Sequence, residues 1–153
     1  MSILFTPGQL MAALSLSKQQ WRTYRRALPR LNADAGRSAC FSAGDLLATA
    51  VAQSASVALQ MPVSALSPVA DGLFEVFSAH PWIRLERASL VLILDEGRVA
   101  LLDSDKRAAP VCALALMIDL KPLVADLRER LLAAGSNAQR ELAFPPLIAG
   151  RRS

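Results

Sequence analysis

The segment "LSKQQWRTYRRALP", residues 16–29, places four basic side chains, a tryptophan and a tyrosine on one short stretch of chain. Ser17 can cap a helix at its start. Pro29 ends that helix, because the residue before a proline disfavours the α-helical region. Trp21 and Tyr24 are three residues apart and therefore share one face. We expect a helix with an apolar side that packs against the protein and a basic side that stays outside.

A shorter helix is expected just before this one. In "TPGQLMAALSL", residues 6–16, Thr6 can act as the N-cap and Pro7 suits the first helical position. The basic helix then runs from Ser17 to about Ala27. Two short helices joined by a tight turn are typical of a helix-turn-helix.

The chain after the basic helix predicts a wing and two more helices. Residues 29–41, "PRLNADAGRSACF", show no helical period and are rich in turn formers, which suits a small hairpin or wing. In "SAGDLLATAVAQSASVAL", Ser42 is the expected cap and Asp45 completes a capping box. A further helix, with Ser64 or Ser67 as its cap, is expected to end near residue 80.

From Pro81 onwards the pattern changes. "ASLVLILDEGRVALLD", residues 88–103, predicts a β-hairpin, and residues 109–120 predict a third strand buried on both faces. Residues 121–135 predict an amphipathic helix that ends at Gly135. We therefore expect an α+β fold, in which a mostly helical winged helix-turn-helix (1–80) precedes a small hairpin-strand-helix module (81–135) and a loosely attached tail (136–153).

Positive charge is concentrated at one end of the chain. Residues 1–41 contain six basic residues and one acidic residue, a net charge of +5, whereas the other residues contain eleven basic and twelve acidic ones, a net charge of −1. Such asymmetry suggests a polyanionic partner for the N-terminal quarter. The alternative for any one exposed cation is an ordinary solvated helix face.

Composition excludes several other classes of protein. With 153 residues, of which 53% are hydrophobic, the chain can bury a core. Its two cysteines are too few for a disulfide framework and lack the spacing of a zinc site. Its apolar runs are far shorter than the roughly 20 residues that span a bilayer. We therefore expect a soluble cytoplasmic protein that binds no membrane.

The N-terminal elements, taken in order, resemble the winged helix-turn-helix of the MerR-type transcription regulators. The pattern of that family's second helix is roughly S-x-x-T-L-R-Y-Y-x-R, and its post-wing helix starts with an aromatic residue followed by S-x-x-D-L. This chain has "SKQQWRTYRR" from Ser17 and "FSAGDL" from Phe41. Trp21 takes the buried apolar position of the second helix. The resemblance covers about half of the chain and several consecutive elements.

The resemblance implies that the second helix enters the major groove of double-stranded DNA. Arg22, Tyr24 and Arg26 match the family's DNA-contacting positions, and Lys18 and Gln19 lie near the helix start, where base edges are reached. The wing departs from the family pattern, because Ala39 and Cys40 stand where arginines are usual and Arg37 is the nearest substitute. The candidate DNA-binding residues are Lys18, Gln19, Arg22, Tyr24, Arg25, Arg26 and Arg37.

The C-terminal module also departs from that family. It replaces the usual long dimerisation helix and effector module, and the cysteine patterns of metal-sensing members are missing. The resemblance therefore implies DNA binding and transcription regulation in a bacterium or phage more than it implies a metal- or drug-responsive activator. Helix-turn-helix proteins commonly dimerise, so we expect residues 82–135 to form a homodimer interface. A fold-completing module in a monomer and a small-molecule pocket are the alternatives.

No catalytic or metal site is predicted. His80, the only histidine, has no positioned nucleophile or carboxylate in its local sequence. Asp95-Glu96 and Asp103-Ser104-Asp105 fall where turns are expected and lack the spacing of a calcium loop. We expect neither enzyme activity nor a cofactor. The second functional hypothesis is a protein-interaction adaptor, whose basic helix docks an acidic partner.

Overall fold

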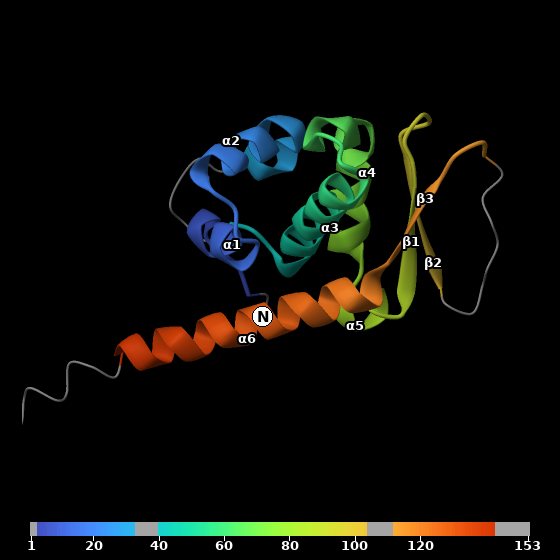
Figure 1. Ribbon diagram of the computed structural model, residues 1–153. Coiled ribbons are helices and arrows are strands. Elements are labelled where there is room, and N and C mark those ends of the chain that lie inside the picture. Colours follow the sequence, from blue (N-terminus) through green and yellow to red (C-terminus); the bar gives the residue numbers. More distant parts are fainter. Residues whose placement is uncertain (1–2, 33–39, 104–111, 143–153) are drawn as a thin grey trace, which may run out of the picture.

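The computed structural model describes residues 3–32, 40–103 and 112–142, and these form a mixed helix-and-sheet structure that confirms the α+β class (Figure 1). The N-terminal part contains α1 (Pro7–Ala13), α2 (Lys18–Ala27), the 3-10 helix η1 (Pro29–Asn32) and α3 (Ala43–Leu59). The next elements are η2 (Val63–Leu66), α4 (Ser67–Ala79) and the short α5 (Trp82–Leu85). The strands β1 (Ala88–Ile93), β2 (Arg98–Asp103) and β3 (Leu116–Asp119) precede α6 (Leu120–Leu142).

Helices α1, α2 and α3 begin with the same local arrangement, a reciprocal capping box. At the start of α2, the Ser17 hydroxyl accepts a hydrogen bond from the Gln20 amide at 3.1 Å, and the Gln20 side chain accepts one from the Ser17 amide at 2.9 Å. Each box satisfies two backbone amides that would otherwise lack a partner. Three predicted caps are therefore confirmed, in the pairs Thr6 with Gln9, Ser17 with Gln20, and Ser42 with Asp45. The predicted cap of the next helix, Ser64 or Ser67, is wrong, because α4 begins at Ser67 itself and its N-cap residue, Leu66, offers no side-chain hydrogen bond.

Helix α1 is shorter than the helix predicted over 6–16, and a tight turn connects it to α2. Helix α1 ends at Ala13, and Ser15 takes the left-handed conformation with φ 54°. The Leu16 amide donates to the Met11 carbonyl at 2.9 Å, and the Ser15 amide donates to the Ala12 carbonyl at 3.2 Å. This is the Schellman pattern of a helix C-terminus, formed with serine at the position where glycine is usual.

Residues 29–32 form η1, and not part of the hairpin or wing that the sequence suggested over 29–41. Leu31 is buried, so the chain turns inward immediately after α2. An isolated antiparallel bridge joins Phe5 to Phe41, which places the start of the described chain beside the start of α3. Residues 33–39, where the tip of the predicted wing falls, lie outside the described residues.

The sheet is antiparallel with the strand order β2-β1-β3. Leu90 and Leu92 of the central strand face the helices and belong to the main core. The predicted hairpin is confirmed, but within the described residues the third strand covers only Leu116–Asp119. It is not buried on both faces, because it forms an edge of the sheet, and Met117 is 59% exposed.

Helix α6 continues past the predicted end at Gly135 to Leu142. Residues 136–142 are therefore helical and not part of a loosely attached tail. A glycine inside a helix lowers its stability by about 1 kcal/mol but does not end it. Although α6 is long, no described helix is both long and apolar enough to cross a membrane.

The core is continuous across the boundary that the sequence suggested at residues 80–81. One hydrophobic cluster contains Leu10 of α1, Leu73 of α4, Leu90 of β1 and Leu127 of α6. Two polar contacts cross the same boundary. Arg130 Nη1 donates to the Ala13 carbonyl at 3.2 Å, and Trp82 Nε1 donates to the Ala43 carbonyl at 3.1 Å. The sheet and α6 thus support the helices that carry the basic face.

Candidate nucleic-acid interface

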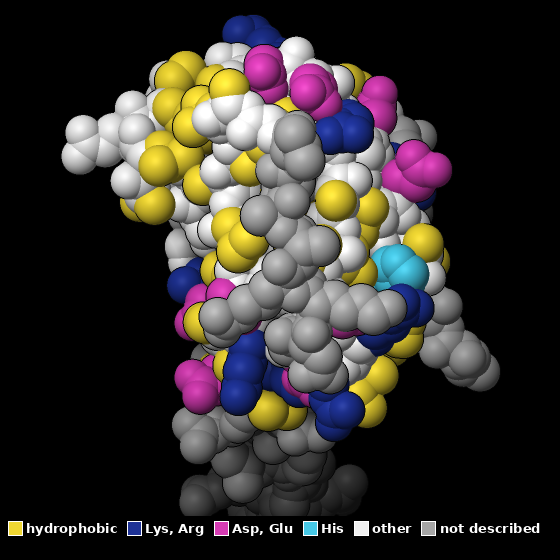
Figure 2. Space-filling view, turned by 90° about the vertical axis from the view of Figure 1, so that its right-hand side faces the viewer, with side chains coloured by type: hydrophobic (Ala, Val, Ile, Leu, Met, Phe, Trp, Pro, Cys, Tyr) yellow, Lys and Arg dark blue, Asp and Glu magenta, His cyan; other side chains and the backbone are white. Residues whose placement is uncertain are grey.

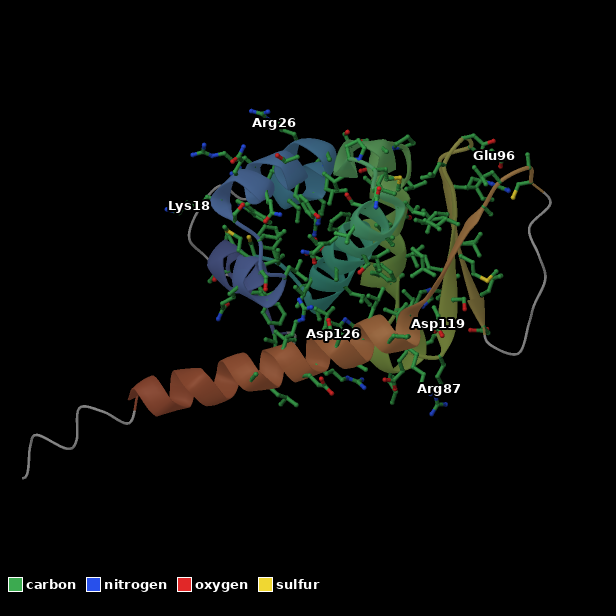
Figure 3. The ribbon with its side chains drawn as sticks, viewed as in Figure 1. Lys18, Arg26, Arg87, Glu96, Asp119 and Asp126 are labelled. Carbon is green, nitrogen blue, oxygen red and sulfur yellow. The ribbon has the colours of Figure 1, made fainter. Side chains whose placement is uncertain are left out.

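Helix α2 has one face in the core and one face in solvent. Trp21 and Tyr24 are each 8% exposed, and the Trp21 ring meets the Phe41 ring edge to face with centroids 5.9 Å apart. The opposite face includes the exposed side chains of Lys18, Gln19, Arg22 and Arg26. Figure 3 shows Lys18 and Arg26 pointing away from the body of the protein. The predicted division between a packed and a basic side is therefore present.

The cations of the solvent face form one row along the helix. Lys18, Arg22 and Arg26 follow each other at four-residue intervals, so neighbouring members lie one turn apart. Like charges at this spacing destabilise a helix by roughly 0.2–0.5 kcal/mol per pair. Lys18 also lies at the positive end of the helix dipole, where a cation is unfavourable. Only Arg26, in the last turn, is favoured by the dipole, so helix stability does not account for the row as a whole.

Few acids are near enough in the sequence to offset the row. Residues 3–32 and 40–66 contain five cations and a single acidic side chain, Asp45, which is 1% exposed. Within the described residues, ion pairs are formed by Arg30, Arg98, Arg128 and Arg130 among others, whereas Lys18, Arg22 and Arg26 form none there. As far as the described residues go, the row is thus a positive surface without acidic neighbours in these segments, available to an anionic partner.

Arg25, another predicted DNA contact, lies at the junction of α2 and η1. Its Nε donates to Asn32 Oδ1 at 2.9 Å, and Asn32 Nδ2 donates back to the Arg25 carbonyl at 2.7 Å. The side chain is half-buried. This reciprocal pair fixes the chain as it leaves α2, so Arg25 has a positioning role that the sequence did not reveal.

The structure does not bring Tyr24 together with the cationic row. Its ring lies on the packed face, and burial raises the pKa of its hydroxyl. A phosphate contact through that hydroxyl stays a prediction. Arg37, the remaining predicted contact, lies outside the described residues.

Arg30 is an exposed cation that the sequence did not single out. It lies on η1, directly after α2, and its Nε is 3.6 Å from Asp45 Oδ1. The sequence marked Asp45 as a helix cap, which it is, because Asp45 Oδ2 accepts a hydrogen bond from the Ser42 amide at 2.9 Å. Only the tertiary fold shows that the second carboxylate oxygen faces Arg30.

The remaining candidates offer no second site among the described residues. His80 follows α4 as its C-cap. Asp95 and Glu96 lie in the hairpin turn, where Glu96 forms an ion pair with Arg98 at 2.8 Å. No group of three or more histidine, cysteine or acidic side chains in the described part of the chain could hold a metal ion.

No protein-family model, curated protein or solved structure matches this chain. The resemblance to MerR-type regulators rests on the residues of α2 and the start of α3, and it stays a prediction. The functional interpretation therefore depends on the geometry of α2 and the charge that it displays.

Proposed function

We propose that this protein is a DNA-binding transcription regulator and that α2 enters the major groove of double-stranded DNA. The observation that supports this most is the row of Lys18, Arg22 and Arg26. It lies on the solvent face of a helix whose other face is packed in the core. The major groove of B-DNA admits an α-helix, and its walls are lined by phosphates that attract such a row.

The exposed side chains of α2 combine the two kinds of contact that a regulator needs. Glutamine and arginine can each form paired hydrogen bonds to base edges, with adenine and guanine respectively. Gln19 and Arg22, both within the first five residues of α2, are the side chains proposed to read bases. Phosphate contacts set the register on the duplex without reading sequence, and Lys18 and Arg26 are proposed for that role.

The surroundings of α2 hold it in one orientation. The Ser17 capping box fixes its start, the Trp21–Phe41 ring contact fixes its middle, and the Arg25–Asn32 pair fixes its end. A helix that is already ordered loses little conformational entropy on binding. In this proposal α1 and α2 act as a MerR-like helix-turn-helix, and two copies read two half-sites through a homodimer that involves residues 82–135.

The proposal can be tested by selecting fragments of sheared genomic DNA on the immobilised protein and sequencing them. Three proteins are compared: wild type, Arg22→Gln/Arg26→Gln, and the control Arg84→Gln/Lys121→Gln. The control also removes two exposed cations, but from α5 and α6. Discrete enriched sites are expected for wild type and control and not for the α2 variant. If all three proteins recover the same DNA fragments equally, the proposal is wrong. The alternative, an adaptor whose basic helix binds an acidic protein, would then be favoured.

A further inference from the structure

An apolar groove lies between the C-terminal half of α3 and the edge strand β3. It consists of two adjoining hollows of about 320 Å³ and 390 Å³. Both are lined by Leu59 and Leu116; Ala58 and Leu123 extend the first hollow, and Leu94 and Leu114 extend the second. We call this feature the α3–β3 groove.

The groove leaves apolar side chains and a strand edge uncovered. Leu114 is 73% exposed and Leu59 is 49% exposed. In the described part of the sheet, β3 pairs with β1 alone, so its outer edge has backbone groups available for another strand. Figure 2 looks onto the sheet and shows hydrophobic side chains gathered at the upper left of the view. An extended segment could pair with β3 and place alternate side chains in the hollows.

The charge at the groove restricts what could fill it. Asp119 lines the first hollow and Asp95 lines the second, and no lysine or arginine is among the described residues that line either one. Figure 3 shows Asp119 where β3 passes into α6. The groove therefore favours an extended segment that combines apolar side chains with basic ones.

The chain itself contains such a segment after α6. Residues 147–152 read Leu-Ile-Ala-Gly-Arg-Arg, with three apolar residues followed within two positions by two arginines. We propose that this segment of one copy docks in the α3–β3 groove of a second copy and that the exchange is reciprocal. This reciprocal docking would form the dimer that reading two half-sites requires, but the docking itself does not depend on DNA binding.

The length of α6 favours a second copy as the partner. Leu123, which lines the groove, lies near the start of α6, and the helix runs straight on to Leu142 (Figure 1). At 1.5 Å per residue, that distance is about 28 Å. The five residues from Leu142 to Leu147 extend at most about 18 Å. Leu147 therefore falls well short of Leu123 of its own chain.

The first test measures the mass of the full chain in solution by light scattering. Ala58→Arg places a long charged side chain in the groove from an exposed helical position, and Leu147→Asp/Ile148→Asp places charge on the docking segment. Ala125→Arg makes the same change at an exposed position of α6 that does not line the groove. Wild type and Ala125→Arg are expected to be dimers, and the other two variants are expected to be monomers.

The second test measures binding directly with a fluorescent peptide of residues 142–153. The receptor is the full-length Leu147→Asp/Ile148→Asp protein, whose own segment is disabled. The peptide should bind saturably, and adding Ala58→Arg to the receptor should weaken binding by roughly tenfold or more. Adding Ala125→Arg should not. A peptide with Arg151→Glu/Arg152→Glu should bind more weakly, and Asp95→Arg in the receptor should restore part of the loss.

Three results would overturn the proposal. They are a monomeric wild type, peptide binding that is indifferent to Ala58→Arg, and a dimer that persists in Leu147→Asp/Ile148→Asp. A dimer lost in Ala58→Arg but kept in that last variant would mean that another part of the second copy covers the groove. The Arg22→Gln/Arg26→Gln protein should remain dimeric, so failure of DNA binding and failure of this docking are distinguishable.

Discussion

Arg30 Nε lies 3.6 Å from Asp45 Oδ1, so an exposed cation of η1 faces a carboxylate that is 1% exposed. The other oxygen of that carboxylate accepts a hydrogen bond from the Ser42 amide at 2.9 Å. One buried side chain thus caps α3 and holds η1, which directly follows the basic helix. The contact joins the start of α3 to the segment that leaves α2.

The Asp45→Asn variant should be less stable than wild type. An asparagine can still accept from the Ser42 amide, but it removes the negative charge that faces Arg30. Because Arg30 is 54% exposed, the expected loss in the free energy of unfolding is modest, about 1–2 kcal/mol. Urea unfolding measures it, with Asp71→Asn on the exposed side of α4 as a near-neutral control. Equal stabilities of the two variants would contradict the role assigned to Asp45.

Two glycines at the second position of their helices should respond oppositely to alanine. A Cβ at Gly44 would lie 2.5 Å from the Phe77 carbonyl oxygen, because α3 and α4 meet there through backbone. Gly44→Ala should lower the free energy of unfolding by about 1–3 kcal/mol. A Cβ at Gly8 meets nothing closer than Thr6 Oγ1 at 3.9 Å, so Gly8→Ala should raise it by about 0.4–1 kcal/mol. A Gly44→Ala protein as stable as Gly8→Ala would show that α3 and α4 are not in close contact.

Tyr24 should ionise at higher pH in the folded protein than in the unfolded chain. Burial raises its pKa from the ordinary value of 10.0, so the folded state keeps a proton that the unfolded state has begun to lose. The contribution of the protonated hydroxyl to the free energy of unfolding is fully present below about pH 10. It is lost as pH rises through the raised pKa of the folded state. Since the chain contains one tyrosine, the near-ultraviolet absorbance of tyrosinate reports this group alone. If the tyrosinate titration of the native protein has the same midpoint as that of the urea-unfolded chain, the hydroxyl lies in solvent and the prediction is wrong.

The elements that the sequence predicted well are those specified by neighbouring residues. A capping box needs only a serine or threonine and a partner three positions later, so the starts of α1, α2 and α3 could be predicted. The packed face of α2 could also be predicted, because Trp21 and Tyr24 lie three residues apart. The hairpin of β1 and β2 follows from two apolar runs around Asp95-Glu96-Gly97.

The features that the sequence did not reveal depend on contacts between distant residues. Nothing local shows that Asn32 holds Arg25, or that Arg130 of α6 reaches the Ala13 carbonyl. The exposed positions of β3 follow from its place at the edge of the sheet, which a run of apolar residues does not specify. Gly135 suggested a helix end, but a single glycine does not stop a helix whose preceding turns are already packed.

The proposed function depends most on α2 as the surface that meets DNA, and the salt dependence of binding tests this most directly. Each phosphate neutralised by the protein contributes about −0.9 to the slope of log K against log salt concentration. Binding to a fluorescent duplex is therefore measured over a range of salt for wild type, Arg22→Gln/Arg26→Gln and Arg84→Gln/Lys121→Gln. The predicted result is a slope that is shallower by about 1–2 for the α2 variant and unchanged for the control. Equal slopes for all three proteins, or a loss confined to the control, would contradict the proposed interface.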